Sequence, residues 1–70
     1  MKIPFDVKKY KSGAKACCRS FFFTPRNIEI HDKYIRADVG TSNVSYNYKF
    51  YTDGRFWRDC NMAFDLMIEE

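Results

Sequence analysis

Apolar and polar positions alternate most regularly between residues 43 and 50. Val44, Tyr46, Tyr48 and Phe50 fall on one face of an extended chain, and the residues between them fall on the other. This period of two predicts a β-strand with one apolar face. The aromatic row has two interpretations: one side of a hydrophobic core, or a platform on which a partner stacks.

The residues before this strand predict a hairpin that turns at positions 32–33. Its pairing sets Ile30 opposite Ile35 and Glu29 opposite Arg36. The apolar pair then lies on one face of the sheet and an opposite-charge pair lies on the other, which is favourable for both. Two strands of an antiparallel sheet are therefore expected here.

A second hairpin is expected through a four-residue loop at positions 40–43. It pairs Val39 with Val44 and Ile35 with Tyr48, so the apolar residues of successive strands share one face. A slip of one residue would turn every side chain to the opposite face, so the parity of the pairing is well specified.

Two further elements are expected near the N-terminus. Asp6 is placed to cap a short helical turn that starts at Val7 and ends at Gly13. The segment 17–23 is typical of a strand, and Pro25 predicts a turn after it.

Residues 55–70 predict an amphipathic helix. Two starts remain open: a cap at residues 52–54, or a start after Asp59 if Asp53 and Gly54 form a hairpin turn. The early start is favoured because Phe56 and Trp57 extend the helical stripe. The stripe has the 3.6-residue spacing of a helix and consists of Phe56, Cys60, Ala63, Phe64 and Met67.

Together these elements predict one α+β domain over residues 1–70. A small antiparallel sheet of three to four hairpin-connected strands would carry the C-terminal amphipathic helix on one face. The helix needs an apolar surface, and the only continuous one holds the aromatic row, so we expect that row to be core. Chains this short bury only about 60% of their unfolded surface. Seven Phe, five Tyr and one Trp compensate for the small size.

The cysteines predict neither a disulfide framework nor a metal site. Three thiols cannot all pair, and Cys17 and Cys18 are adjacent, which places them on opposite faces of a strand. No paired ligands have the spacing of a zinc site, so no metal and no cofactor are expected. The N-terminus lacks the apolar stretch of a signal peptide, and no run is long enough to cross a membrane. We therefore expect a cytoplasmic protein with reduced cysteines.

Charge is distributed unevenly along the chain. Residues 1–26 hold seven basic residues and one acidic residue, whereas residues 27–70 hold five basic and eight acidic ones, for a net charge of +3. A basic N-terminal third is suited to an acidic partner surface, although a charge run of this length also serves solubility. The face of the sheet opposite the core mixes cations with aromatic rings, and that composition is compatible with a protein-binding patch or with single-stranded nucleic acid.

Binding is expected rather than catalysis. His31 is the only histidine, and the chain has neither a Gly-rich phosphate loop nor a pair of carboxylates with catalytic spacing. The leading hypothesis is a protein-binding module, a small inhibitor or adaptor that docks on a larger protein or nucleoprotein machine. The alternative is a small nucleic-acid-binding protein that uses the basic N-terminal third and the polar sheet face. The candidate partner-binding residues are Lys8, Lys9, Lys11, Lys15, Tyr34, Arg36, Lys49 and Trp57.

Dense aromatic residues in a single small domain give the chain a style that is similar to that of small phage-encoded inhibitor proteins. The resemblance implies a host protein as the target, including one that itself binds nucleic acid.

Overall fold

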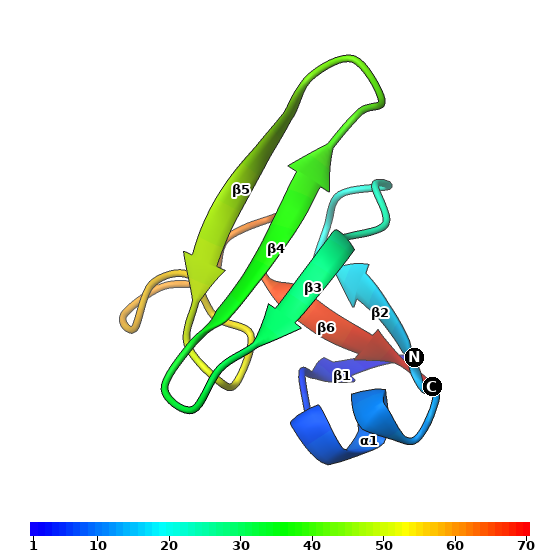
Figure 1. The fold of residues 1–70 in the computed structure, drawn as a ribbon, viewed down its shortest axis with the longest axis vertical. Coiled ribbons are helices and arrows are strands. Elements are labelled where there is room, and N and C mark those ends of the chain that lie inside the picture. The colour runs from blue at the N-terminus through cyan, green and yellow to red at the C-terminus, as the bar shows by residue number, and fades with distance from the viewer.

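The computed structural model describes all 70 residues and shows two three-stranded antiparallel sheets packed against each other (Figure 1). The first sheet has the strand order β1-β6-β2, and the second has the order β3-β4-β5. The core lies between the sheets, since its buried side chains come from both. The elements are β1 Lys2–Pro4, α1 Val7–Lys11, β2 Lys15–Cys18, β3 Arg26–Ile30, β4 Ile35–Gly40, β5 Ser45–Phe50 and β6 Leu66–Glu69.

The C-terminal helix predicted over residues 55–70 is wrong. Residues 51–65 form an irregular loop, and the chain then enters β6, the central strand of the first sheet. The predicted α+β class is therefore also wrong, because the only helix is the five-residue α1. No helix of the protein has the length and apolar character that crossing a bilayer requires.

Two physical reasons explain why a strand forms where a helix was expected. Leu66, Met67 and Ile68 are all buried, so both faces of β6 are covered and the backbone pairs with a strand on each side. A run with two buried faces shows no period of two, and a short run of this kind cannot be told from a helix by its pattern. In the loop, the Asp65 carboxylate accepts the N–H groups of Phe56 and Met62, and these bonds hold the backbone in a non-helical conformation.

The second sheet confirms the expected hairpins and their parity. Ile30 lies opposite Ile35 and Glu29 lies opposite Arg36, as the pattern predicts. Between β4 and β5 the register differs by two residues from the expected one, so Ile35 lies opposite Phe50. A shift of two leaves every side chain on its expected face.

The register shift begins at the loop between β4 and β5. Gly40 belongs to β4 and pairs with Ser45, so the loop comprises residues 41–44. Gly40 has a φ of +144°, and a Cβ at this position would overlap the carbonyl oxygen of Val44 and lie 2.7 Å from the Ser45 Cα. The Thr41 hydroxyl accepts the Val44 N–H (2.9 Å), and this contact closes the loop.

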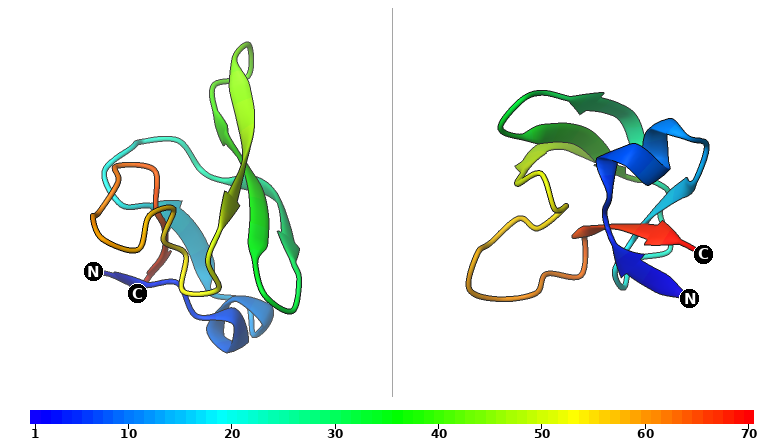
Figure 2. Two further views of the ribbon diagram at one scale, coloured as in Figure 1. Left: turned by 90° about the vertical axis from the view of Figure 1, so that its left-hand side faces the viewer. Right: turned by 90° about the horizontal axis from the view of Figure 1, so that it is seen from below.

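The aromatic row of β5 divides into a buried half and an exposed half. Phe50 is fully buried and Tyr48 is partly buried, where it stacks on Phe64 with ring centroids 4.6 Å apart. Tyr46 is 61% exposed and Val44 is 56% exposed. The β4–β5 hairpin projects beyond the first sheet, so nothing covers its tip (Figure 2, left). The expectation that the whole row is core holds only for its C-terminal half.

The N-terminal elements agree only in part with those expected from the sequence. Asp6 caps α1 as expected, with its carboxylate accepting the Lys9 N–H at 3.1 Å, and Gly13 follows the helix with a φ of +107°. The strand expected over residues 17–23 ends at Cys18. The three phenylalanines that follow lie in a loop, and Phe22 is entirely exposed.

The cysteines differ sharply in exposure. Cys18 is fully buried on β2, and burial raises the pKa of its thiol to about 11. The neighbouring Cys17 is partly buried, and desolvation raises the pKa of that thiol as well. This agrees with the expected opposite faces. Cys60, expected in the core, is exposed in the 51–65 loop because the helix stripe does not exist.

This exposure predicts an order of thiol alkylation at neutral pH. Cys60 should react first, Cys17 more slowly and Cys18 only after unfolding, because a thiol with a pKa near 11 holds roughly one thiolate in ten thousand molecules at pH 7. Mass spectrometry of iodoacetamide-treated protein would give the order, and denatured protein should lose the differences. Equal rates in the folded protein would contradict this packing.

Candidate binding pocket at the edge of strand β5

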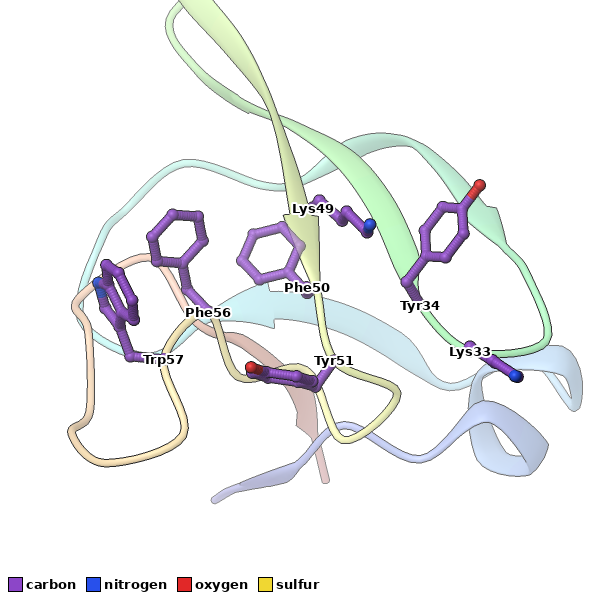
Figure 3. Close-up of a pocket in the computed structure, with 7 residues that line it drawn as sticks. All are labelled: Lys33, Tyr34, Lys49, Phe50, Tyr51, Phe56 and Trp57. Carbon is purple, nitrogen blue, oxygen red and sulfur yellow. The ribbon is translucent and has the colours of Figure 1, made fainter.

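The largest pocket of the protein, with a volume of about 560 Å³, lies at the C-terminal end of β5 (Figure 3). We call it the β5-edge pocket. The end of β5 lies between the two groups of side chains that line it. Phe50, Phe56 and Trp57 lie on one side, and Lys33, Tyr34 and Lys49 lie on the other (Figure 3). Tyr51 completes the lining.

Aromatic rings form most of this surface. Trp57 meets Phe56 edge to face with ring centroids 5.4 Å apart, and Phe56 in turn contacts the buried Phe50 at 6.2 Å. Trp57 is 55% exposed and Tyr51 is 42% exposed, so part of each side chain is accessible to a ligand. Rings anchored in the core yet open on one side offer a large apolar area at low conformational cost.

Cations surround the rings, and no acidic side chain lines the pocket. The Lys49 ammonium lies 4.7 Å from the centre of the Tyr34 ring, and the Arg36 guanidinium lies 5.9 Å from the same ring. Arg58 lies 5.4 Å from the ring of Tyr51. These cation–π contacts hold the positive charges close to the pocket without neutralising them.

The 51–65 loop brings Phe56 and Trp57 to the sheet, and Asp65 fixes that loop. The Asp65 carboxylate is fully buried and accepts three hydrogen bonds. They come from the Phe56 N–H (3.0 Å), the Met62 N–H (3.0 Å) and the Arg19 Nε (3.2 Å). One side chain thus joins the two ends of the loop to the segment that follows β2.

Gly54 makes a second attachment. Its carbonyl accepts the Leu66 N–H at 2.8 Å, which fixes the start of the loop to the first residue of β6. Gly54 has a φ of +87°, and a Cβ there would overlap the Leu66 carbonyl oxygen and lie 2.6 Å from the Phe5 Cβ. Only glycine fits this conformation and this close approach.

The structure brings together some of the sequence-predicted binding residues and separates others. Tyr34, Lys49 and Trp57 line the β5-edge pocket, and Arg36 reaches its border through Tyr34. The four N-terminal lysines lie on α1 and β2, away from this lining. They are Lys8, Lys9, Lys11 and Lys15.

The basic N-terminal third does not remain an isolated positive region in the fold. Because β6 lies between β1 and β2, the acidic C-terminus meets the basic N-terminus. Lys9 pairs with Glu70, which raises the pKa of Lys9, and the N-terminal ammonium lies 3.3 Å from the Glu69 carboxylate. Lys8 and Lys9 also line a shallow depression of about 400 Å³ that includes Glu70.

The polar face of the second sheet is a hydrogen-bonded network that contains both acidic and basic side chains. Asp38 accepts from the side-chain amides of Asn27 (2.8 Å) and Asn47 (2.9 Å), which lowers the pKa of Asp38. Arg36 donates to the Asn47 carbonyl oxygen at 2.9 Å. Glu29 and Asp38 lie on this face beside the cations, so the face offers no continuous positive track.

Sequence reasoning missed several residues that build the pocket. The sequence pattern marks Lys33 only as part of a turn, and it places Phe56 on a helix stripe. The sequence pattern does not mark Asp65 as important, because a single aspartate in a loop forms no recognisable motif. The sequence does contain a signal against a helix around Trp57. Residues 52–61 include several poor helix formers, namely Thr52, Asp53, Gly54, Asp59 and Asn61.

Comparison of the chain with family models, curated proteins and solved structures finds no match. No three His, Cys, Asp or Glu side chains gather in the fold in a way that would hold a metal ion.

Proposed function

We propose that this protein is a protein-binding module, acting as a small inhibitor or adaptor, and that its β5-edge pocket takes an acidic segment of a partner protein. The observation that carries the proposal is the pocket lining, which combines five aromatic rings with two lysines and no carboxylate. Buried aromatic anchors dominate the energy of protein interfaces, and complementary charge accelerates and orients the encounter.

The same lining supports a binding role over catalysis. It contains no imidazole, thiol or carboxylate, the groups that most often act as acids, bases or nucleophiles. Its ionisable groups are two ammonium groups and two phenols, and Lys33 and Lys49 form no ion pair within the protein. Both lysines are therefore available to an acidic partner.

A selection from a random displayed peptide library, with the protein as bait, tests the proposal. The enriched peptides should carry Asp or Glu together with a large apolar residue. Trp57 is the only tryptophan and lines the pocket, so its fluorescence reports occupancy directly. Enriched peptides that bind without changing this fluorescence, or a selection that enriches no acidic peptide, would refute the proposal.

Substitutions should separate this pocket from the N-terminal lysines. Trp57→Ala should weaken peptide binding about 30-fold, as loss of an interface anchor does. Lys49→Ala should weaken it about fivefold, mainly through the association rate. Lys11→Ala removes an equal charge from exposed α1 and should change affinity less than about twofold. Isothermal titration would give the three affinities, and an equal loss for Lys11→Ala and Lys49→Ala would contradict the assignment to the pocket.

Single-stranded nucleic acid is the second candidate, favoured by the exposed aromatic side chains of Trp57 and Tyr51 beside cations. Four cations, Lys33, Arg36, Lys49 and Arg58, would give a log affinity–log salt slope of about −2 to −3. The carboxylates on the sheet face oppose it, because a phosphate backbone would meet Glu29 and Asp38. Tight binding of oligothymidylate at physiological salt, lost in Trp57→Ala, would favour this candidate over the first.

A further inference from the structure

Strand β5 is an edge strand of the second sheet and pairs with β4 alone. The Thr41 N–H donates to the Val44 carbonyl oxygen at 2.8 Å, which makes this facing pair hydrogen-bonded. Hydrogen-bonded and non-hydrogen-bonded pairs alternate along an antiparallel ladder. The even-numbered residues of β5 therefore bond to β4, and the backbone groups that face outward are those of Ser45, Asn47 and Lys49.

The outward-facing run ends where the loop begins. Tyr51 is the next odd-numbered residue, and its N–H is already taken by the Arg55 carbonyl oxygen at 2.8 Å. No backbone group of Ser45, Asn47 or Lys49 takes part in a loop or turn hydrogen bond. The open edge thus spans β5 from the hairpin tip to the β5-edge pocket.

The other three sheet edges carry features that discourage pairing. Strand β3 has an irregular register between Arg26 and Glu29, with Asn27 at a φ of +52°. Strand β1 has three residues and ends in Pro4, and on the four-residue β2 the Cys18 carbonyl accepts the Lys2 ammonium. Bulges, prolines, lysines and short strands are the usual protections of an edge. Strand β5 has six residues and only one lysine.

We infer that the partner segment binds as an added β-strand along the free edge of β5, with its side chains alternating between acidic and apolar. This inference rests on the proposed function and specifies how the ligand lies. The pocket encloses the end of the edge from both sides (Figure 3), so successive side chains of an added strand would face its two walls in turn. One wall is apolar, with Phe56 and Trp57, and the other is cationic, with Lys33 and Lys49.

The exposed residues of the hairpin continue the same pattern. Tyr46 and Val44 extend the apolar side toward the tip, and both are more than half exposed. On the opposite side, Asn47 follows Lys49 and holds the Arg36 guanidinium at 2.9 Å. A second copy of this chain is a poorer occupant, because pairing two β5 strands would bring together two lysine-bearing edges of a protein with net charge +3.

Two sets of synthetic hexapeptides of equal composition test the inference. In the first set Asp or Glu alternates with Val, Ile or Leu, and in the second the acidic and apolar residues form separate blocks. The alternating peptides should bind at least about 10-fold more tightly, and N-methylation should weaken them about 10-fold at every second amide only. Hydrogen exchange should show new protection of the Ser45, Asn47 and Lys49 amides.

The outcomes separate this inference from the proposed function. If both sets bind equally, change Trp57 fluorescence and leave the three amides unprotected, the pocket binds acidic peptides and the added strand is wrong. If neither set binds and the displayed-library selection also fails, both proposals fall. If the three amides become protected in the protein alone as its concentration rises, with a dimer in sedimentation, the occupant is a second copy and the inference is overturned.

Discussion

Asp65→Ala is expected to lower the free energy of unfolding by about 3–5 kcal/mol, the cost typical of removing one partner from a buried ion pair. The carboxylate is fully buried and accepts from Phe56, Met62 and Arg19. Without it, two backbone N–H groups and one guanidinium lose their acceptor together. A domain of this size has little stability in reserve, so most of the protein should be unfolded at 37 °C.

Urea denaturation followed by circular dichroism would measure the loss. Asp59→Ala is the matched control, because Asp59 is an exposed aspartate of the same loop and forms no ion pair. It should change stability by less than about 0.5 kcal/mol. If the two variants unfold at the same urea concentration, Asp65 does not organise the loop as described.

Gly54→Ala is expected to cost about 3–5 kcal/mol through two effects that add. The φ of +87° is strained for any residue with a Cβ, and the new methyl group would collide with the Leu66 carbonyl and the Phe5 Cβ. Neither obstacle is the flexible end of a side chain, so relief requires moving β6 or the loop. The Leu66 N–H bond to the Gly54 carbonyl would then be lengthened or lost.

Gly13→Ala isolates the backbone-strain part of this effect, so the steric part is the difference between the two variants. Gly13 also has a positive φ, +107°, but its Cβ would meet nothing within 4 Å. This variant should therefore pay only the backbone strain, about 1–2 kcal/mol. Thermal melts of the two variants would give the difference, and equal melting temperatures would show that the Gly54 contact with β6 is looser than described.

The Asp65→Ala and Gly54→Ala variants bear on function because Asp65 and Gly54 hold the same loop. Phe56 and Trp57 form the apolar wall of the β5-edge pocket only while Gly54 and Asp65 fix the loop to β6. A milder variant, Asp65→Asn, keeps the shape and some acceptor capacity. It should weaken peptide binding more than Asp59→Ala does, even under conditions where the protein remains folded.

The local sequence pattern was sufficient to predict those strands that pair in the sheet with the strand next to them along the chain. The strands β3, β4 and β5 follow one another through short hairpins, so their alternation predicted both their existence and their faces. The cap at Asp6 was likewise readable, because an N-cap acts within three residues. The two-residue error between β4 and β5 arose at Gly40, where the strand continues through a conformation that glycine permits.

The first sheet was not predictable in this way. Strand β6 pairs with β1 and β2, more than 45 residues away, and its burial on both faces removed the alternation that marks a strand. The apparent helix stripe had a different origin. Phe56 and Phe64 do meet, with ring centroids 5.0 Å apart, but the loop folds back to join them around Asp65.

The parity of the second sheet, the excess of aromatic residues and the positive net charge all follow from residue identity and near-neighbour spacing alone. The positions at which these properties act depend on long-range packing. This packing paired the basic N-terminus with Glu69 and Glu70, and so reduced the charge asymmetry of the chain. It also carried Trp57 to the free edge of β5 beside Lys49, because a buried carboxylate and a glycine contact fixed a loop that no local pattern encodes.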